Sequence, residues 1–375
     1  MAGREHFDVI IIGSGIAGAS LAYFLSERGM TNILLLERES QPGYHSTGRS
    51  AAVLVEWDAI PALQELKAQG GAFLRHPPAG FSEQQVLHPT GILIAFQEPV
   101  WNAVRELVPL LRQRGTAALT LSQSEVLARI PVLAPAHFDG AVFLPDDGHI
   151  DVHELLWSYL RQASRRGVQR RCDAEVTGIR VEAGRCRGVV TSAGEFDAGW
   201  VVNAAGAWAS RIAMLAGAAA IPITPHRRTI ITFAAPNGLD VSRWPLVTNE
   251  SHHLYFAPEA GGLFASPMDE HPMEPCDVQP DDLVVAETID RLARLAPDLV
   301  PRTIRRKWSG LRSFAPDRVL VVGHDPQVKG FFWLAGQGGC GIETSPAVGR
   351  IAADLLLDGR TEHYDAAVLS PARFT

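Results

Sequence analysis

The stretch that decides the fold is IIGSGIAGAS, Ile11 to Ser20. Its glycines Gly13, Gly15 and Gly18 have the spacing GxGxxG, directly after the apolar run Phe7–Ile12 and at the start of a helical pattern. In such a strand, turn and helix, the first glycine makes the tight turn and the second lets a pyrophosphate approach the backbone. The third lets the helix pack closely on the strand. Free N–H groups at the helix start attract phosphates, so the motif predicts a dinucleotide site.

A second apolar run, Asn32–Glu37, ends on a carboxylate about twenty residues after the motif, where such sites bind ribose hydroxyls. The chain then enters the polar stretch ERESQPGYHSTGRSAA, Glu37 to Ala52, where a continuous nucleotide-binding domain would place its second helix. Nicotinamide and flavin dinucleotides both fit the glycine motif. Further strand-to-glycine turns, VVNAAGAW (Val201–Trp208) and LAGQGGCGIETS (Leu334–Ser345), indicate several returns to one sheet. A long cofactor held by many segments, FAD, is therefore favoured.

Composition argues against several other classes. The 375 residues are long enough for two buried cores, and 46% of them are hydrophobic. A net charge of -7 with scattered basic residues argues against a nucleic-acid partner. The four cysteines have no CxxC spacing, so no metal site is predicted and a reducing cytoplasm fits best. No stretch reaches the ~18 apolar residues of a membrane span. Glu5, Asp8 and the glycines argue against a secretory signal at the start of the chain.

Two styles of sequence alternate along the chain. Helical patterns are predicted at Ala17–Arg28, Val152–Arg166 and Asp281–Leu295, whereas the helical signals between Ala59 and Asp146 are brief. The alternation predicts interleaved domains in an α/β plus α+β fold. A Rossmann-like FAD-binding domain is expected from residues 1–50, 147–215 and 318–375, and a substrate-binding domain on a largely antiparallel sheet from residues 51–146 and 216–317.

Six stretches together resemble the glycine oxidase and D-amino-acid oxidase family of flavoproteins, over essentially the whole chain. They are IIGSGIAGAS, LLERESQPGYHSTGRSAA, VVNAAGAWAS, TPHRRT, WSGLRSFAPD and GFFWLAGQGGCGIETS. Within the family the likeness is to the bacterial FAD-dependent D-arginine dehydrogenase type. The resemblance implies that the polar stretch wraps the pyrophosphate and the flavin edge. It implies cofactor contacts by Gly13, Gly15, Ile16, Ala17, Gly18, Glu37, Arg38, His45, Ser46, Thr47, Arg49, Ser50, Ala51, Ala52, Val176, Gly206, Trp208, Gly310, Gly339, Gly341, Ile342, Glu343 and Thr344.

Two of these positions carry a more specific expectation. A helix start at Gly339–Thr344 would stabilise negative charge on reduced flavin. Some relatives attach flavin covalently through a histidine in a context like that of His45. The D-arginine dehydrogenase type has the same histidine and binds FAD without a covalent bond, so non-covalent FAD is expected here.

The resemblance also implies a substrate clamp. Oxidising an amino acid by flavin requires placement of the α-carbon and electrostatic control of the amine. A planar guanidinium is suited to hold a carboxylate by both oxygens. By likeness, Arg228 and Arg312 match the arginines that bind the substrate carboxylate, and Tyr255 matches the tyrosine that helps them.

The chain departs from the D-arginine dehydrogenase pattern in the substrate pocket, where Val53, Ile92 and Gly339 are expected. Ile92 stands where an acid would hold a guanidinium, which should lower preference for arginine by at least ~10²-fold. Val53 stands at the family's active-site histidine, and Cys340, expected as a small buried thiol, at a tyrosine. The lid tyrosine position is Asp58 or Trp57, and no general base can be named. Loose candidates are Glu56, Asp58, His252 and His253.

The leading interpretation is FAD-dependent oxidation of the α-carbon of an amino acid to the imino acid, by hydride transfer to flavin N5. The substrate is expected to be a D-amino acid with a small, apolar or neutral side chain. An alternative is a secondary or cyclic amino acid that is hydroxyproline-, proline- or sarcosine-like. A further alternative is a non-catalytic flavin-carrying subunit of an electron-transfer complex. The electron acceptor is either oxygen or a respiratory quinone.

Overall fold

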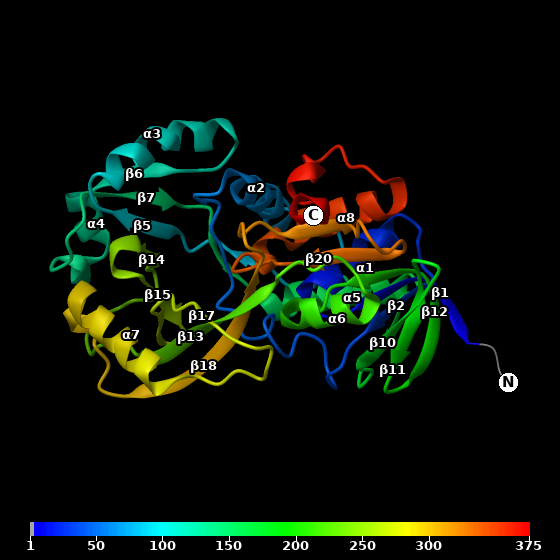
Figure 1. Cartoon of the computed structure of the whole chain (residues 1–375). Coiled ribbons are helices and arrows are strands. Elements are labelled where there is room, and N and C mark those ends of the chain that lie inside the picture. The colour runs from blue at the N-terminus through cyan, green and yellow to red at the C-terminus, as the bar shows by residue number, and fades with distance from the viewer. Residues whose placement is uncertain (1–3) are drawn as a thin grey trace.

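The computed structural model describes residues 4–375, which form two sheet-based units side by side (Figure 1). The first sheet has eight strands in the order β10-β11-β12-β1-β2-β9, with β20 beside the second half of β12 and β19 beside β20. Strands β20, β12, β1, β2 and β9 are parallel to one another. The bounds are β1 Glu5–Ile12, β2 Ile33–Leu36, β9 Gln169–Arg171, β10 Val176–Glu182, β11 Arg185–Thr191, β12 Gly194–Asn203, β19 Val321–His324 and β20 Phe331–Ala335.

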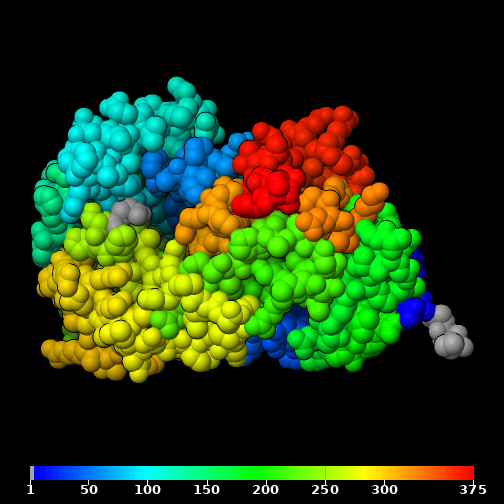
Figure 2. Space-filling view, viewed as in Figure 1, coloured from blue at the N-terminus to red at the C-terminus, as the bar shows by residue number. Residues whose placement is uncertain are grey.

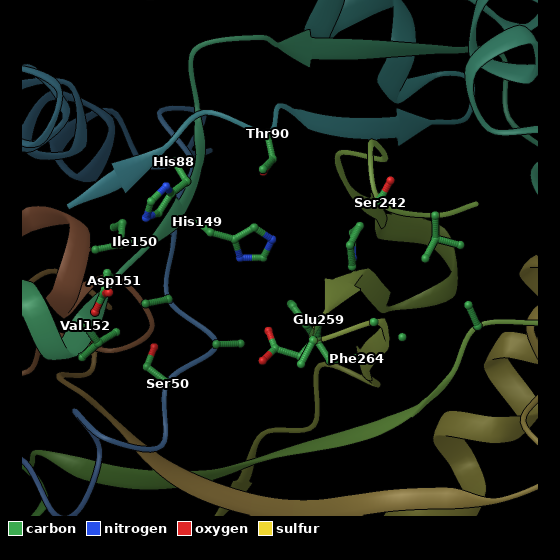
Figure 3. A pocket seen from close by; sticks show the side chains of 18 of the residues that line it. Ser50, His88, Thr90, His149, Ile150, Asp151, Val152, Ser242, Glu259 and Phe264 are labelled. Atoms are coloured by element: carbon green, nitrogen blue, oxygen red, sulfur yellow. The ribbon is translucent and has the colours of Figure 1, made fainter. Parts of the chain in front are cut away.

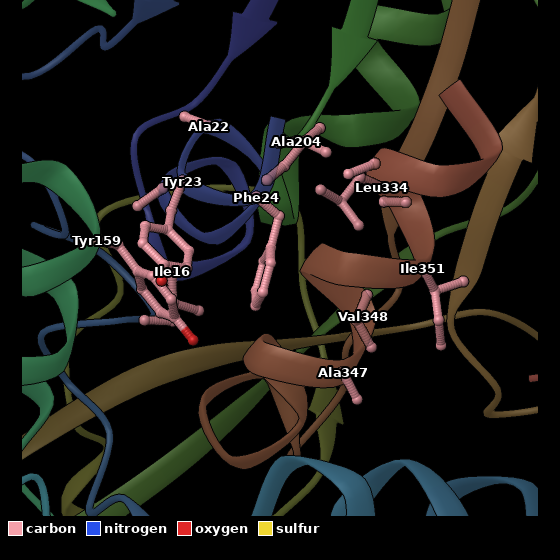
Figure 4. Packing of buried hydrophobic residues seen from close by; sticks show 14 of the residues in the cluster. Ile16, Ala22, Tyr23, Phe24, Tyr159, Ala204, Leu334, Ala347, Val348 and Ile351 are labelled. Atoms are coloured by element: carbon pink, nitrogen blue, oxygen red, sulfur yellow. The ribbon is translucent and has the colours of Figure 1, made fainter. Parts of the chain in front are cut away.

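Helices cover one face of this sheet, and Figure 4 shows part of their packing. The four helices are α1 Ile16–Glu27, α2 Pro61–Arg75, α5 Val152–Arg165 and α8 Gly341–Asp358. On the other face lie α6 Ala209–Ala216 and side chains of the β10–β11 hairpin. Alternate residues of β1 enter the two cores, since Val9 and Ile11 belong to one and Ile10 and Ile12 to the other. Burial on both faces is why β1 and β2 are continuous apolar runs.

The second sheet has nine strands in the order β17-β13-β16-β15-β14-β5-β7-β6, with β18 beside β13. All pairs are antiparallel except β14 with β5. One face packs against α7 Asp282–Leu295 and α4 Gln123–Arg129, and the other carries α3 Val100–Gln113. The bounds are β5 Ile92–Phe96, β6 Leu119–Ser122, β7 Gly140–Leu144, β13 Thr224–Ala234, β14 Leu246–Asn249, β15 Leu254–Glu259, β16 Gly262–Ser266, β17 His271–Pro272 and β18 Ile304–Phe314.

Short elements join the two units. A three-stranded sheet pairs β8 Gly148–Ile150 with β3 Val53–Leu54 and with β4 Leu87–His88. The 3₁₀ turns are η1 Pro131–Leu133, η2 Gly206–Trp208, η3 Glu250–His252, η4 Pro297–Leu299, η5 Ala366–Val368 and η6 Pro371–Phe374.

The predicted fold class, an α/β sheet unit interleaved with a largely antiparallel one, is confirmed. The three predicted helices are present as α1, α5 and α7, each within a residue of its expected bounds. The expectation of only brief helices between residues 59 and 146 is wrong, because α2 and α3 have 15 and 14 residues. Gly70 and Gly71 in α2 and Pro109 in α3 obscure the pattern, since both residue types disfavour helix interiors.

The domain boundaries stay a proposal, and α2 bears on where they fall. Its residues Leu63, Leu66, Phe73 and Leu74 pack in the same core as α1, α5 and α8. In the space-filling view α2 lies between the α3 segment and the C-terminal residues (Figure 2). We therefore propose to count α2 with the first unit, although it lies within the range expected for the second.

Candidate functional site

The predicted dinucleotide turn has the geometry that its glycines require. Gly13 has a φ of +103°, and a Cβ there would lie 2.5 Å from the carbonyl oxygen of Ala204. A Cβ on Gly18 would lie 2.0 Å from the Gly13 oxygen, so the first turn of α1 packs directly on the glycine turn. The Ile16 N–H, at the start of α1, donates to Thr47 Oγ1 over 3.1 Å. The turn therefore brings the polar stretch and the N-terminus of α1 together.

Glu37 lies at the end of β2, beside this turn. Its Oε2 accepts hydrogen bonds from the Ser14 N–H and hydroxyl at 3.1 and 2.8 Å, and its Oε1 accepts from the Glu39 N–H at 3.0 Å. Oε1 accepts only this one hydrogen bond and can accept a further one. Because Glu37 also lines the adjoining pocket, its carboxylate can accept from ribose hydroxyls there.

Two connected pockets follow the polar stretch. The first, which we call the dinucleotide pocket, has a volume of about 530 Å³ and lies against the glycine turn. Ten predicted cofactor residues line it. These are Gly13, Gly15, Glu37, Arg38, His45, Ser46, Thr47, Val176, Gly206 and Trp208. We call the second the clamp pocket. It shares Gly15, Ser46, Thr47 and Gly206 with the first and adds Ile16, Ala17, Arg49, Ser50, Ala51, Gly310, Gly339, Gly341 and Ile342, together with Arg228 and Arg312. The residues present therefore fit FAD. Its adenosine and pyrophosphate would lie at the glycine turn, and its flavin ring would lie near the two arginines.

The side chain of His45 is held in place in the dinucleotide pocket. Its Nε2 lies 2.8 Å from Glu39 Oε1, and its ring centroid is 4.6 Å from that of Trp208. Arg38 lies over the same indole at 4.4 Å and also pairs with Glu39. Burial alone would raise the pKa of Glu39, but the hydrogen bond from His45 and the charge of Arg38 hold it below its ordinary value. The His45 ring lines the dinucleotide pocket and not the clamp pocket.

Two neighbouring strands place the arginines on one face of the second sheet. Arg228 of β13 pairs in register with Gly310 of β18, and His226 pairs with Arg312. Arg228 and Arg312 are therefore diagonal neighbours with side chains on the same face. Arg227 points to the opposite face, where it pairs with Asp269 and Asp281.

The clamp contains two buried polar atoms without a partner. Arg228 is 4% exposed. Its Nη2 pairs with Glu270 at 2.8 Å, and its Nε donates to the backbone carbonyl oxygen of Asp269. Among the described residues, Arg228 Nη1 and the Tyr255 hydroxyl have no hydrogen-bond partner. Burial, and next the charge of Arg312, lower the pKa of Arg228 to about 10, which leaves it protonated at neutral pH. Unpartnered buried donors are costly, so a ligand that accepts from both is the expected occupant.

The absence of a side chain at Gly339 leaves space for the Arg312 guanidinium. Gly339 lies between β20 and α8, and a Cβ there would be 2.9 Å from Arg312 Nη1. Next to it, Cys340 is 7% exposed, and burial raises the pKa of its thiol to about 12. The thiol is therefore inert at neutral pH, in line with the expected role.

Several predicted residues, Tyr255 and Gly18 among them, line neither pocket. Ala52 lines neither, Val53 is half-buried, and Ile92 is fully buried, packing with Tyr255 in one apolar cluster instead of lining a cavity. Thr344 donates its hydroxyl to the Cys340 carbonyl, and Glu343 contacts Val55 and Lys67. Their side chains are thus engaged within the protein, and their contact with the flavin stays a prediction.

The loose candidates for a general base are also engaged elsewhere. Glu56 and Asp58 form ion pairs with Arg75 and Lys67. His252 contacts Asn249 through Nδ1, and burial lowers its pKa. None of the four candidates lines the clamp pocket.

Sequence reasoning missed Asp269 and Glu270, which hold Arg228, and Lys67 and Arg75 of α2. Each of these contacts joins segments far apart in the chain, and no local spacing indicates it. The one available signal was the pair of adjacent acids in PMDEHP.

A wider cavity of about 800 Å³ lies on the other side of the Ser50–Ala52 segment (Figure 3). His88 and His149 lie on one side of it, and Glu259 and Phe264 on another. None of its lining residues is Arg or Lys, so it offers no cation to a carboxylate or phosphate. The predicted clamp residues do not line it.

Residues 4–375 lack two further features. No group of three or more His, Cys, Asp and Glu side chains in this range could hold a metal ion. Over the same range, no helix is both long and apolar enough to cross a bilayer.

The glycine turn of the first sheet and the pocket against it are typical of dinucleotide-dependent oxidoreductases. Residues 8–355 match the family model described as DAO, FAD dependent oxidoreductase, and the chain belongs to that family. It is 26% identical over 420 residues to FAD-dependent oxidoreductase domain-containing protein 1 of Bos taurus, covering 99% of this chain and 85% of the relative. It is also 26% identical to sarcosine oxidase subunit beta of Rhizobium meliloti, covering 97% and 88%.

A solved structure supports the fold independently. L-Proline dehydrogenase from P. horikoshii superposes with a TM-score of 0.88 at 23% identity, covering 99% of this chain and 98% of that one. The cofactor is FAD, as the family requires. The likeness to the D-arginine dehydrogenase type stays a prediction.

Proposed function

We propose that this FAD-dependent amino-acid oxidoreductase oxidises the α-carbon of a small, neutral amino acid to the imino acid. The observation that carries the proposal is the unpartnered buried Arg228 Nη1 beside Arg312 in the clamp pocket, together with the unpartnered Tyr255 hydroxyl that is buried near Arg228. Bound FAD would supply the hydride acceptor. The residues of the chain bind the carboxylate, orient the α-carbon and exclude water.

The proposed roles differ among the three clamp residues. Arg228 is fixed by Glu270 and by the Asp269 carbonyl, so it presents the two unpartnered N–H groups of Nη1 on a guanidinium that is held in place. Arg312 adds the second positive charge, next to Gly339. Tyr255 donates its hydroxyl hydrogen from β15. A carboxylate that accepts from all three would be held with little freedom, and the chemistry at the α-carbon would follow from that placement.

Two classes of substrate amine fit the clamp. A primary D-amino acid with a small, apolar or neutral side chain is implied by the sequence resemblance. A secondary amino acid, N-methylated or cyclic, is favoured by the sarcosine and proline enzymes among the similar proteins. Product analysis after anaerobic turnover separates them: ammonia supports the first, and methylamine or a ring imine supports the second. No product with any amino acid would contradict the proposal and favour a non-catalytic flavin-carrying subunit.

Replacing Tyr255 by Phe should weaken substrate binding more than it slows the chemistry. The hydroxyl is one of three proposed donors, and a hydrogen bond to a charged group contributes about 1.5–3 kcal/mol. We therefore expect KM to rise about 10- to 100-fold, with kcat within a few-fold of the parent enzyme. Steady-state kinetics measure both constants. An unchanged KM would show that the hydroxyl does not contact the carboxylate.

The flavin should be held without a covalent bond. His45 is engaged by Glu39 and lines the dinucleotide pocket, away from the two clamp arginines. We expect acid precipitation of the yellow holoprotein to leave all of the flavin in the supernatant. A yellow pellet that turns colourless in a His45→Asn variant would contradict this expectation.

A further inference from the structure

One face of α2 packs unusually close to its neighbours. Lys67, Gly70, Gly71, Leu74 and Arg75 follow the i, i+3, i+4, i+7, i+8 spacing of a single helix face. A Cβ on Gly70 would lie 2.0 Å from a backbone oxygen in the first turn of α8, and a Cβ on Gly71 would lie 2.2 Å from a carboxylate oxygen of the 53–58 segment. Glycine is a poor helix former, so its presence twice in α2 is explained by this close approach.

Lys67 joins this segment to α8 from the first turns of α2. Its Nζ lies 2.8 Å from Asp58 Oδ2 and 3.3 Å from Glu343 Oε1, and its side chain is only 9% exposed. Glu343 Oε2 in turn accepts the Val55 N–H at 2.7 Å. Burial opposes the charge on Lys67, but Glu343 and Asp58 outweigh it and hold the pKa above its ordinary value. The buried ammonium therefore stays charged and holds two carboxylates.

Arg75 makes an equivalent connection two turns later. Its Nη1 lies 2.6 Å from Glu56 Oε1, and its Nη2 lies 2.7 Å from Asp147 Oδ1. Asp147 Oδ2 also accepts the Glu56 N–H at 2.7 Å. Both carboxylates are 1% exposed. The 53–58 segment is thus fixed through the side chain and the backbone of Glu56.

The segment has two sides with different partners. One set of alternating residues points to α2 and the first core, and the other packs against the apolar cluster that contains Tyr255 and Ile92. The first set is Leu54, Glu56 and Asp58, and the second is Val53, Val55 and Trp57. Contacts made by α2 on one side therefore set the position of apolar side chains on the other.

We propose that Lys67 and Arg75 are positioning residues: they fix the 53–58 segment against the apolar cluster whose member Ile230 forms a wall of the clamp pocket, and so determine which substrate side chains fit beside the clamp. The proposal rests on the proposed function for the meaning of the pocket. Neither residue lines the clamp pocket or touches the clamp residues, so each acts through Val53 and Trp57.

Two probes of different size test this in the holoprotein. Acetate can occupy only the clamp, whereas pyrrole-2-carboxylate also contacts the pocket wall and has no saturated α-carbon to oxidise. Dissociation constants come from the change in the visible flavin spectrum. In Lys67→Met we expect the acetate constant to stay within about twofold. The pyrrole-2-carboxylate constant should rise about tenfold, because misplacing a contact by about 1 Å is enough for such losses.

A second readout does not depend on any ligand. Hydrogen exchange of the peptide covering residues 53–60 should become about tenfold faster in Lys67→Met, since the Val55 amide loses an acceptor that is held in place. Arg28→Met is the matched control, because Arg28 forms exposed pairs with Asp354 and Asp358 at the far end of α8. Neither probe constant nor the exchange of this peptide should change in the control.

The outcomes separate the two proposals. Unchanged exchange, or equal weakening of both probes, would overturn the positioning role. A wild-type protein that binds neither probe would contradict the carboxylate clamp, while the exchange data would still decide the role of Lys67. If Lys67→Met does not fold, Lys67→Met/Asp58→Asn removes the ammonium together with its nearer carboxylate, so that only Glu343 loses its partner. The same rise in the ratio of the two constants is expected there, and a wild-type ratio would overturn the proposal.

Discussion

Replacing Arg312 by Met should leave a yellow, folded protein whose flavin is reduced by amino acids about 10²- to 10³-fold more slowly, the loss expected when a buried charged contact is removed. Arg312 lies diagonally opposite Arg228 on the neighbouring strand, and Gly339 leaves room for its guanidinium. A single remaining arginine would hold the carboxylate at one point only. The α-carbon would then lose the orientation that hydride transfer needs.

Anaerobic rapid mixing measures this effect directly, as loss of the oxidised flavin spectrum. Arg306→Met is the matched control: it lies on the same strand, β18, and its side chain is exposed. The control should reduce at the parent rate. If the flavin of Arg312→Met is reduced at the parent rate, Arg312 does not bind the substrate carboxylate.

Replacing Gly13 by Ala should weaken FAD binding at least ~10²-fold, enough to yield a nearly colourless protein at micromolar concentration. Gly13 adopts a φ of +103°, which a residue with a Cβ rarely takes. The new methyl group would also lie 2.5 Å from the Ala204 carbonyl oxygen. The turn would have to move, and with it the N–H groups that are aimed at the pyrophosphate.

A glycine outside the site provides the control for backbone strain alone. Gly29 ends α1 with a φ of +87°, and a Cβ there meets nothing within 4 Å. Gly29→Ala should lower the free energy of unfolding by about 1 kcal/mol and leave the FAD dissociation constant unchanged. Fluorescence titration of each apoprotein with FAD gives the FAD dissociation constants of the two variants. Equal effects of the two substitutions would show that the Gly13 turn does not contact the cofactor.

Much of the fold could be predicted from the sequence because the patterns that indicate it are local. The glycine turn, the apolar strands around it and the amphipathic pattern of α5 each depend on a few neighbouring residues. α2 was missed because its close packing on α8 needs Gly70 and Gly71, which weaken the helical signal. Its ion pairs with Glu56 and Glu343 are contacts across the fold that no spacing reveals.

The site shows the same division. Residues in contiguous motifs, such as Ser46 and Thr47, line the cofactor pockets where the family resemblance placed them. Expectations transferred to single positions stay predictions, and two such side chains have partners within the protein: Ile92 is fully buried and Glu343 contacts Lys67. Such side chains take their direction from packing partners that belong to distant segments. The roles of the clamp residues stay predictions until substrates are tested.

The central claim is that buried donors anchor an amino acid by its carboxylate next to FAD. Anaerobic mixing of the wild-type holoprotein with matched pairs tests it most directly: D-alanine, L- and D-proline and N-methylglycine, each against its methyl ester. We predict that at least one free acid bleaches the oxidised flavin spectrum and that its ester does so at least ~10²-fold more slowly, because the clamp loses its charged partner. Equal bleaching by acid and ester, or no bleaching by any acid, would contradict the account.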